Sequence, residues 1–110
     1  MIGMLLLIYN IFICFQGVFF LHSYNVAHLD FKTGNLTWEI QKQQLHIIDL
    51  GNARKLKGKL IHGYRGTKGY MAPEVSDVIN YDAFKADIWA VGCTISMIGR
   101  SYVRIKNVSL

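Results

Sequence analysis

Cysteine and proline are scarce in this sequence, which has two cysteines and one proline in 110 residues. Cys14 and Cys93 stand far apart and neither belongs to a CxxC pair, so we expect no disulfide framework and no zinc site. The four histidines show no HExxH or similar ligand spacing, which argues against a metal site built from histidine. This cysteine usage is typical of a reducing compartment, and we therefore expect a cytoplasmic location.

Low-complexity segments are also missing. The chain has no linker rich in Gly, Ser or Pro, no acidic tail and no internal repeat. Its apolar content of 52% is too high for a disordered chain. The length fits one small domain with a modest core, so we expect a single unit over residues 1–110.

Acidic residues are absent from the middle of the chain. Between Asp49 and Glu74 the sequence has six basic residues and no acidic one. A nucleic-acid patch would interleave aromatic residues with the basic ones, but only Tyr64 and Tyr70 lie nearby, so we expect no nucleic-acid partner. We interpret the stretch as a solvated basic loop that attracts phosphates or acidic partners. The basic residues are Arg54, Lys55, Lys57, Lys59, Arg65 and Lys68.

Charge is absent from the first 21 residues, which are dense in Leu, Ile and Phe. About twenty apolar residues span a bilayer, so hydropathy alone predicts a membrane helix. A signal peptide fits less well, because the segment has no basic start and no small-residue cleavage site. We favour a helix buried inside the domain, since the polar loop at His28 begins six residues after His22 and leaves no room for a membrane-exit linker. A membrane anchor over residues 1–21 is the alternative.

The rest of the chain shows short periodic segments. Leu36–Glu39 and Leu45–Ile48 are apolar runs separated by polar residues, a hairpin-like pattern. Residues 23–35 and 51–69 are predicted as loops, and long loops in compact domains are usually functional. Residues 82–99 predict a helix whose apolar surface comprises Ile88, Trp89, Val91, Ile95 and Met97. The pattern predicts an α+β fold that is mainly helical and contains one short β-hairpin.

One group of polar residues suits phosphoryl transfer. Asp30 and Asn35 are five residues apart with Lys32 between them, and Asp49 follows the predicted hairpin. Taken singly, Asp30 fits a turn and Asn35 a cap. Together, one carboxylate orients an attacking hydroxyl, a cation balances a phosphate, and oxygen ligands hold magnesium.

Four sequence segments resemble the protein kinase catalytic domain. LHSYNVAHLDFKTGN resembles the catalytic loop with the helix end before it, and HIIDLGNAR resembles the magnesium-binding Asp-Phe-Gly segment. GTKGYMAPE resembles the end of the activation segment, and KADIWAVGCTI resembles the start of the long central helix. Their order matches the family over most of the chain, so the sequence is similar to part of the large lobe of a serine/threonine protein kinase.

The resemblance implies a role for each matching residue. Asp30 would be the catalytic base, and Lys32 would contact the transferred phosphate of ATP. Asn35 and Asp49 would bind Mg²⁺ on the ATP phosphates. Lys32 with the Gly-Thr pair at Thr67 implies specificity for Ser or Thr in a protein substrate.

Four further residues would provide structural support by the same resemblance. Thr67 would buttress Asp30 and Lys32, and Glu74 would anchor the activation segment. Asp87 would tie the central helix to the catalytic loop by hydrogen bonds, and His28 is expected to be structural.

The sequence departs from the family at Leu29, where many kinases carry an arginine that pairs with a phosphate on the activation loop. Residues 52–66 contain no Ser or Thr, so the usual phosphate acceptor is absent as well. We therefore hypothesise that threonine phosphorylation does not switch this segment. Leu50 stands where the family usually has Phe, a volume-conserving change.

The sequence contains no glycine-rich phosphate loop, no strand lysine for the α- and β-phosphates and no partner glutamate for that lysine. The helices that complete the large lobe, and the late arginine that would pair with Glu74, are also not found. We expect little kinase activity from these 110 residues alone, because positioning supplies most of phosphoryl-transfer catalysis. We also expect the apolar surface of residues 82–99 to be partly exposed. The alternative function is a non-catalytic kinase-like module that binds a protein partner through that surface.

Overall fold

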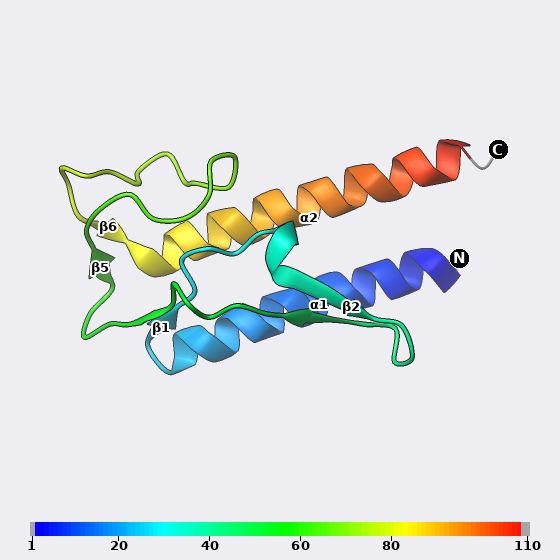
Figure 1. Ribbon diagram of the computed structural model, residues 1–110, viewed down its shortest axis with the longest axis horizontal. Coiled ribbons are helices and arrows are strands. Elements are labelled where there is room, and N and C mark those ends of the chain that lie inside the picture. Colours follow the sequence, from blue (N-terminus) through cyan, green and yellow to red (C-terminus); the bar gives the residue numbers. More distant parts are fainter. Residues whose placement is uncertain (1, 109–110) are drawn as a thin grey trace.

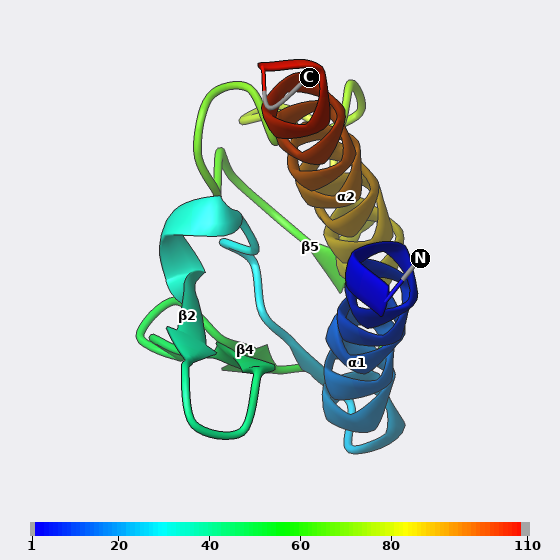
Figure 2. The ribbon, with the colours of Figure 1, turned by 90° about the vertical axis from the view of Figure 1, so that its right-hand side faces the viewer.

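The computed structural model describes residues 2–108, with the side chains of all residues in that range except 2, 7 and 101–108. The two helices are α1 (Ile2–Ser23) and α2 (Ala83–Val108), which run antiparallel along the long axis of the molecule (Figure 1). A single 3₁₀ turn, η1, covers Thr33–Asn35. The strands are β1 (Val26–Ala27), β2 (Leu36–Glu39), β3 (Gln44–Ile47), β4 (Arg54–Lys55), β5 (Leu60–Ile61) and β6 (Tyr81–Asp82). Figure 2 shows the helices on one side and β2 and β4 on the other.

Helix α1 confirms the predicted helix but not its predicted burial on all sides. Its buried face carries Asn10, Cys14 and Val18, which are four residues apart and therefore share one side of the helix. The opposite face is open, with Leu5 62% and Phe20 63% exposed. The prediction of all-round burial was wrong because the described elements cover α1 from one side only. Residues Gly3–Ser23 are long and apolar enough to cross a membrane by length and composition, and 18% of the most apolar window is buried.

The predicted hairpin is present as β2 and β3, which pair antiparallel with Leu36 opposite Ile47. It packs on α1 through Leu45 and Ile47, which lie against the core. Asn10 joins the two elements, because its Oδ1 accepts the Leu45 N–H at 3.1 Å while its Nδ2 donates to the Leu6 carbonyl at 2.9 Å. The buried amide is therefore satisfied at both ends.

Helix α2 begins at a side-chain cap and extends beyond the predicted residue 99. The Asp82 carboxylate accepts the N–H groups of Phe84 and Lys85 at 3.0 and 3.1 Å, which satisfies two of the free donors at the helix start. Val91 is buried, whereas Trp89 is 48% exposed. The predicted apolar surface is thus divided between the core and solvent, as expected for a partly exposed helix.

The main core cluster comprises Cys14, Val18, Phe31, Ala90 and Val91. It forms where α1, the loop after β1 and α2 meet, so the loop is held between the helices. The predicted loops also contain short strands, since β1 pairs with β4 and β5 pairs with β6. Helices packed with small antiparallel sheets confirm the α+β class.

Candidate active site

The loop after β1 is fixed to α2 by a buried carboxylate. Asp87 is 2% exposed and accepts the N–H of His28 at 2.7 Å and of Leu29 at 2.8 Å. The His22 Nε2 lies 2.8 Å from the same carboxylate, at the end of α1. Leu29 has a φ of 69°, in the left-handed region that is costly for a branched side chain. The bond from its N–H to Asp87 holds this strained conformation in place.

The backbone of Asp30 is held by its own loop. Its N–H donates to the His28 Nδ1 at 3.1 Å, and its carbonyl accepts the Asn35 Nδ2 at 2.7 Å. The second bond closes the turn η1 around the residue, because Asn35 is buried at the end of that turn. The position of the Asp30 side chain is therefore set by side chains on both sides of it.

The Asp30 carboxylate has a partner on each oxygen. The Thr67 hydroxyl donates to Oδ1 at 2.7 Å and accepts the Lys32 Nζ at 2.9 Å. The Asn52 Nδ2 donates to Oδ2 at 3.3 Å, and the Lys32 Nζ lies 3.8 Å from the same oxygen. The Asp30 side chain is 13% exposed and that of Lys32 29%. The carboxylate is thus oriented and still accessible to a hydroxyl from solvent.

Asp49 lies close to this group through the backbone. The Ile48 N–H donates to the Asn35 carbonyl at 2.8 Å, so Asp49 follows directly after a residue bound to Asn35. Asp49 has a φ of 60° and is exposed, and its Oδ1 accepts the Gly51 N–H at 3.0 Å. The second carboxylate oxygen of Asp49 and the amide oxygen of Asn35 are available as ligands.

Magnesium fits this donor set. Mg²⁺ prefers oxygen ligands, keeps several waters, and binds through one or two carboxylates together with substrate phosphates. An amide oxygen and a carboxylate meet that requirement. In the part of the chain that the structure describes, there is no group of three or more His, Cys, Asp or Glu suited to a metal. A metal site made of protein ligands alone is therefore not found among these residues.

His28 and Glu74 occupy different environments. His28 is fully buried, its ring lies edge-on to Phe31 at 5.8 Å, and its Nε2 has no hydrogen-bond partner among the described residues. An unpaired buried donor costs stability. Glu74 is exposed and forms no ion pair within residues 3–100, where side chains other than that of residue 7 are described.

The structure therefore brings Asp30, Lys32, Asn35 and Thr67 together, with Asp49 beside them and Glu74 apart. Two contacts were not anticipated from the sequence. Asn52 reaches Asp30, and His22 reaches Asp87. Neither residue type carries a signal of its own, because both contacts depend on how distant segments fold together.

A small cavity of about 20 Å³, room for roughly one water, lies beside Asp30 under the segment that carries Thr67. The residues that line it include Leu29, Asp30, Arg65, Gly66, Thr67 and Tyr70. The Tyr70 hydroxyl is 2.9 Å from the Thr33 hydroxyl. These contacts hold residues 65–70 against the loop that contains Asp30.

Comparisons with known proteins agree with this geometry. Residues 8–107 match the family model described as protein kinase domain. CBL-interacting serine/threonine-protein kinase 15 of Arabidopsis thaliana is 35% identical over 86% of this chain, which covers 23% of that protein. Serine/threonine-protein kinase pakF of Dictyostelium discoideum is 42% identical over 73% of this chain, covering 7% of that protein. A probable serine/threonine-protein kinase PLK of Dictyostelium discoideum is 34% identical over 90%, covering 11%. The chain thus spans less than a quarter of the length of these relatives.

Proposed function

The chain belongs to the protein kinase domain family, and from this membership we propose that it forms part of a serine/threonine protein kinase. The reaction is transfer of the γ-phosphate of ATP to a Ser or Thr hydroxyl of a protein substrate. Relatives that share about a third or more of their aligned residues are named serine/threonine kinases, which supports this substrate class. The observation that carries the proposal is the Asp30 carboxylate, held by Thr67 beside the Lys32 ammonium.

Asp30 orients the attacking hydroxyl and accepts its proton as the new oxygen–phosphorus bond forms. The bond between the γ-phosphorus and the bridging oxygen breaks in the same displacement, and that oxygen leaves on ADP. Thr67 holds Oδ1 of Asp30, and Oδ2 carries the longer contact from Asn52 at 3.3 Å, which the substrate hydroxyl replaces in this proposal. Lys32 places a positive charge within 3.8 Å of that oxygen, where the transferred phosphate gains negative charge.

Asn35 and Asp49 supply the oxygen ligands for Mg²⁺ in this proposal. When bound, the ion neutralises charge on the phosphates of ATP. The bond from Asn35 Nδ2 to the Asp30 carbonyl couples the ligand to the catalytic loop, because it points the amide oxygen away from that carbonyl. A change at Asn35 therefore disturbs both the metal site and the position of Asp30.

The test is phosphate transfer from labelled ATP to protein by the native protein, isolated from its source through an affinity tag. Asp30→Asn and Asp49→Asn, introduced in the same protein, are expected to lower the rate by at least about 100-fold. Asp77→Asn is the matched control, because Asp77 is exposed and lies outside the candidate site, where its carboxylate accepts the Tyr64 N–H. Equal rates in the wild type and the Asp49→Asn variant would exclude the proposed chemistry.

A non-catalytic module is the second candidate, and one observation favours it. Trp89 on α2 and Phe12 on α1 are 48% and 57% exposed on apolar helix faces, which suits a protein partner that covers them. This candidate predicts that the native protein transfers no phosphate yet co-purifies with a stoichiometric partner. Charged substitutions at Trp89 would release that partner, whereas Asp49→Asn would not.

We also propose a cytoplasmic location, supported by two cysteines that are both free thiols in the structure. The alternative is membrane association through α1, whose outer face is apolar. Carbonate extraction separates the two, because a protein anchored by α1 stays in the membrane pellet. Recovery in the soluble fraction supports the cytoplasmic location.

A further inference from the structure

The segment over residues 52–68, here called the basic loop, carries six cations and no acidic residue, and the Asp77 carboxylate outside it accepts the Tyr64 N–H of the loop. Its six cations form no ion pair in the part of the chain whose side chains are described, where the cations in such pairs are Lys32, Lys42, His22 and His46. Arg54 and Arg65 donate instead to backbone carbonyls of Ala53 and His62, which are neutral. The loop therefore presents a field that attracts anions.

The basic loop is fixed to the candidate active site at both ends. Asn52 donates to one oxygen of the Asp30 carboxylate, and Thr67 donates to the other. Arg65 lines the same small cavity as Asp30. The loop's cations accordingly lie along a segment that starts and ends at the residue proposed to meet the substrate hydroxyl.

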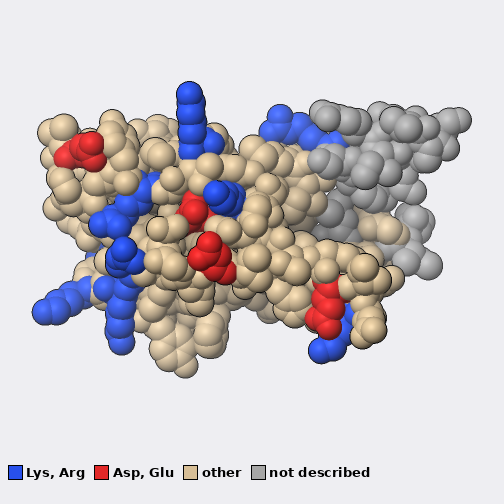
Figure 3. All heavy atoms as spheres, in the orientation of Figure 1, with Lys and Arg blue, Asp and Glu red and all other residues tan. Residues whose placement is uncertain are grey.

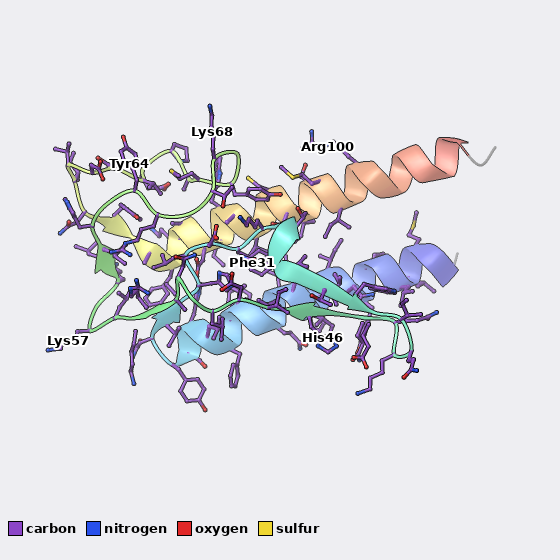
Figure 4. The ribbon with its side chains drawn as sticks, viewed as in Figure 1. Phe31, His46, Lys57, Tyr64, Lys68 and Arg100 are labelled. Atoms are coloured by element: carbon purple, nitrogen blue, oxygen red, sulfur yellow. The ribbon has the colours of Figure 1, made fainter. Side chains whose placement is uncertain are left out.

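Two lysines of the basic loop, Lys57 and Lys68, point outward from this segment. In Figure 3, basic side chains gather mainly over the left half of the molecule, which carries the basic loop. Lys57 and Lys68 project away from the body of the molecule in Figure 4. Both side chains are exposed, so they are free to meet charges on another molecule.

Residues 52–66 of the basic loop supply no compensating anion. They contain no Ser or Thr that could carry a phosphate, and no acidic residue. The positive field is therefore directed at a ligand that comes from outside the segment.

A protein ligand fits this surface better than a nucleic acid. Stacking on exposed aromatic rings supplies much of the binding to single strands. Tyr64 is the one exposed aromatic residue of the basic loop, and Tyr70, just beyond it, is half-buried and bonded to Thr33. A surface that has exposed cations but few aromatic rings for base stacking is suited to bind the carboxylate side chains of a protein.

We propose that the basic loop selects protein substrates with Asp or Glu near the Ser or Thr that accepts phosphate. The proposal rests on the kinase function above and names the substrate class of that same site. Lys57, Lys59 and Lys68 are the selecting residues, and Arg65 lines the same cavity as Asp30. These residues position the substrate and take no part in the chemical step.

The test measures binding separately from phosphate transfer. Fluorescence anisotropy of labelled peptides with the native protein compares a central Ser flanked by Glu, by Gln or by Lys. The Glu peptide is expected to bind about tenfold more tightly than the Gln peptide at low salt, and the difference should shrink as salt screens the charges. The double variant Lys57→Gln, Lys59→Gln should weaken Glu-peptide binding by about threefold to tenfold and leave the Gln peptide unchanged.

Lys42→Gln is the matched control. Lys42 is also an exposed lysine, but it pairs with Glu39 at 3.8 Å in the β2–β3 turn. Its loss lowers the net charge by one unit, which is half the change in the double loop variant. Glu-peptide binding should not change in this variant if the location of the charge matters more than the total.

The outcomes separate this proposal from the kinase function. If the Glu and Gln peptides bind equally, or if a single-stranded oligonucleotide competes more strongly than the Glu peptide, selection of acidic substrates is excluded. Phosphate transfer with a preference for neutral peptides would also exclude it and leave the kinase function standing. Selective Glu-peptide binding without any phosphate transfer would support binding of acidic peptides by the basic loop and contradict the proposed kinase reaction.

Discussion

Asp87 holds the position of the loop that carries Asp30. Its buried carboxylate accepts two backbone N–H groups of the loop and contacts His22 at the end of α1. A single side chain on α2 therefore connects both helices to the segment that carries Asp30. Because one of the two donors belongs to Leu29, which has a positive φ, Asp87 also offsets the cost of that conformation.

Asp87→Ala is expected to lower the free energy of unfolding by about 3 kcal/mol, since it leaves two buried N–H groups without acceptors. Urea unfolding followed by far-UV circular dichroism measures the change. Asp77→Ala is the control, because the exposed Asp77 accepts one N–H, from Tyr64 at 3.0 Å, and should cost less than about 1 kcal/mol. Similar losses in both variants would show that the buried contacts of Asp87 add nothing.

The two thiols differ in reactivity for physical reasons. Cys14 is 1% exposed, and burial raises the pKa of its thiol, so little thiolate forms near neutral pH. Cys93 is half-buried and lines an open groove of about 370 Å³ on α2. Accessibility therefore favours Cys93.

Iodoacetamide is expected to modify Cys93 in the folded chain and Cys14 only after unfolding. Mass spectrometry of peptides after timed labelling checks the order. In the Cys93→Ser variant the native chain should take up almost no label, and urea should restore one equivalent per chain. Native labelling of Cys14 at the rate of Cys93 would contradict the packing of α1 on the core.

Among the helices and strands, the sequence pattern predicted those that are long and periodic. The predicted helix over residues 1–21 is α1. The predicted run Leu36–Glu39 has the bounds of β2, and the predicted run Leu45–Ile48 is shifted by one residue from β3 at each end. The pairs β1–β4 and β5–β6 were not predicted, because strands of two residues have no period and their partners are far away in the chain. Burial of α1 could not be predicted either, since a helix that is apolar all round does not indicate which side is covered.

The candidate site was accessible to sequence reasoning for a different reason. Asp30, Lys32 and Asn35 lie within one short segment, so their proximity follows from spacing alone. The contact of Asn52 with Asp30 depends on the turn after Asp49, where a positive φ redirects the chain. Residue type indicates that turn only weakly, because aspartate adopts a positive φ far less often than glycine.

Glycine substitutions compare the two helices. Gly92→Ala on α2 is expected to raise the free energy of unfolding by about 0.5 to 1 kcal/mol, because nothing described lies within 4 Å of the added Cβ. Gly17→Ala on α1 gains the same helix propensity, but its Cβ would lie 2.6 Å from the Ile47 Cδ1, so that side chain must move. We expect the clash with Ile47 to cancel most of the stability that Gly17→Ala gains from helix propensity.

Parallel urea titrations of the two variants measure this difference. Gly92 lines the groove beside Cys93, so its result also reports on that surface. A loss of stability in Gly92→Ala would mean that the groove is covered by another part of the native protein. A gain would mean that it is open.

The whole molecule is elongated, and its shape explains how much apolar surface is left open. The radius of gyration is 15.1 Å with principal extents of 49 × 25 × 19 Å, whereas a compact chain of about this size has a radius near 13 Å. Two long antiparallel helices with small sheets on one side form a thin body, in which few side chains can be covered from all directions. Leu5, Phe12 and Phe20 on α1 and Trp89 on α2 are exposed as a result.

Exposed apolar faces of this kind promote association. The 110-residue chain is therefore expected to self-associate as its concentration rises, which size-exclusion chromatography with light scattering detects as an increase in mass. The double variant Leu5→Lys, Phe12→Lys should remain monomeric at concentrations where the wild type does not, because it places charge on the outer face of α1. Gln16→Lys is the matched control, since Gln16 is exposed on the same helix and its change adds charge without removing apolar surface. If Gln16→Lys suppresses association as strongly as the double variant, added charge on this face is sufficient, and the loss of apolar surface does not govern the association.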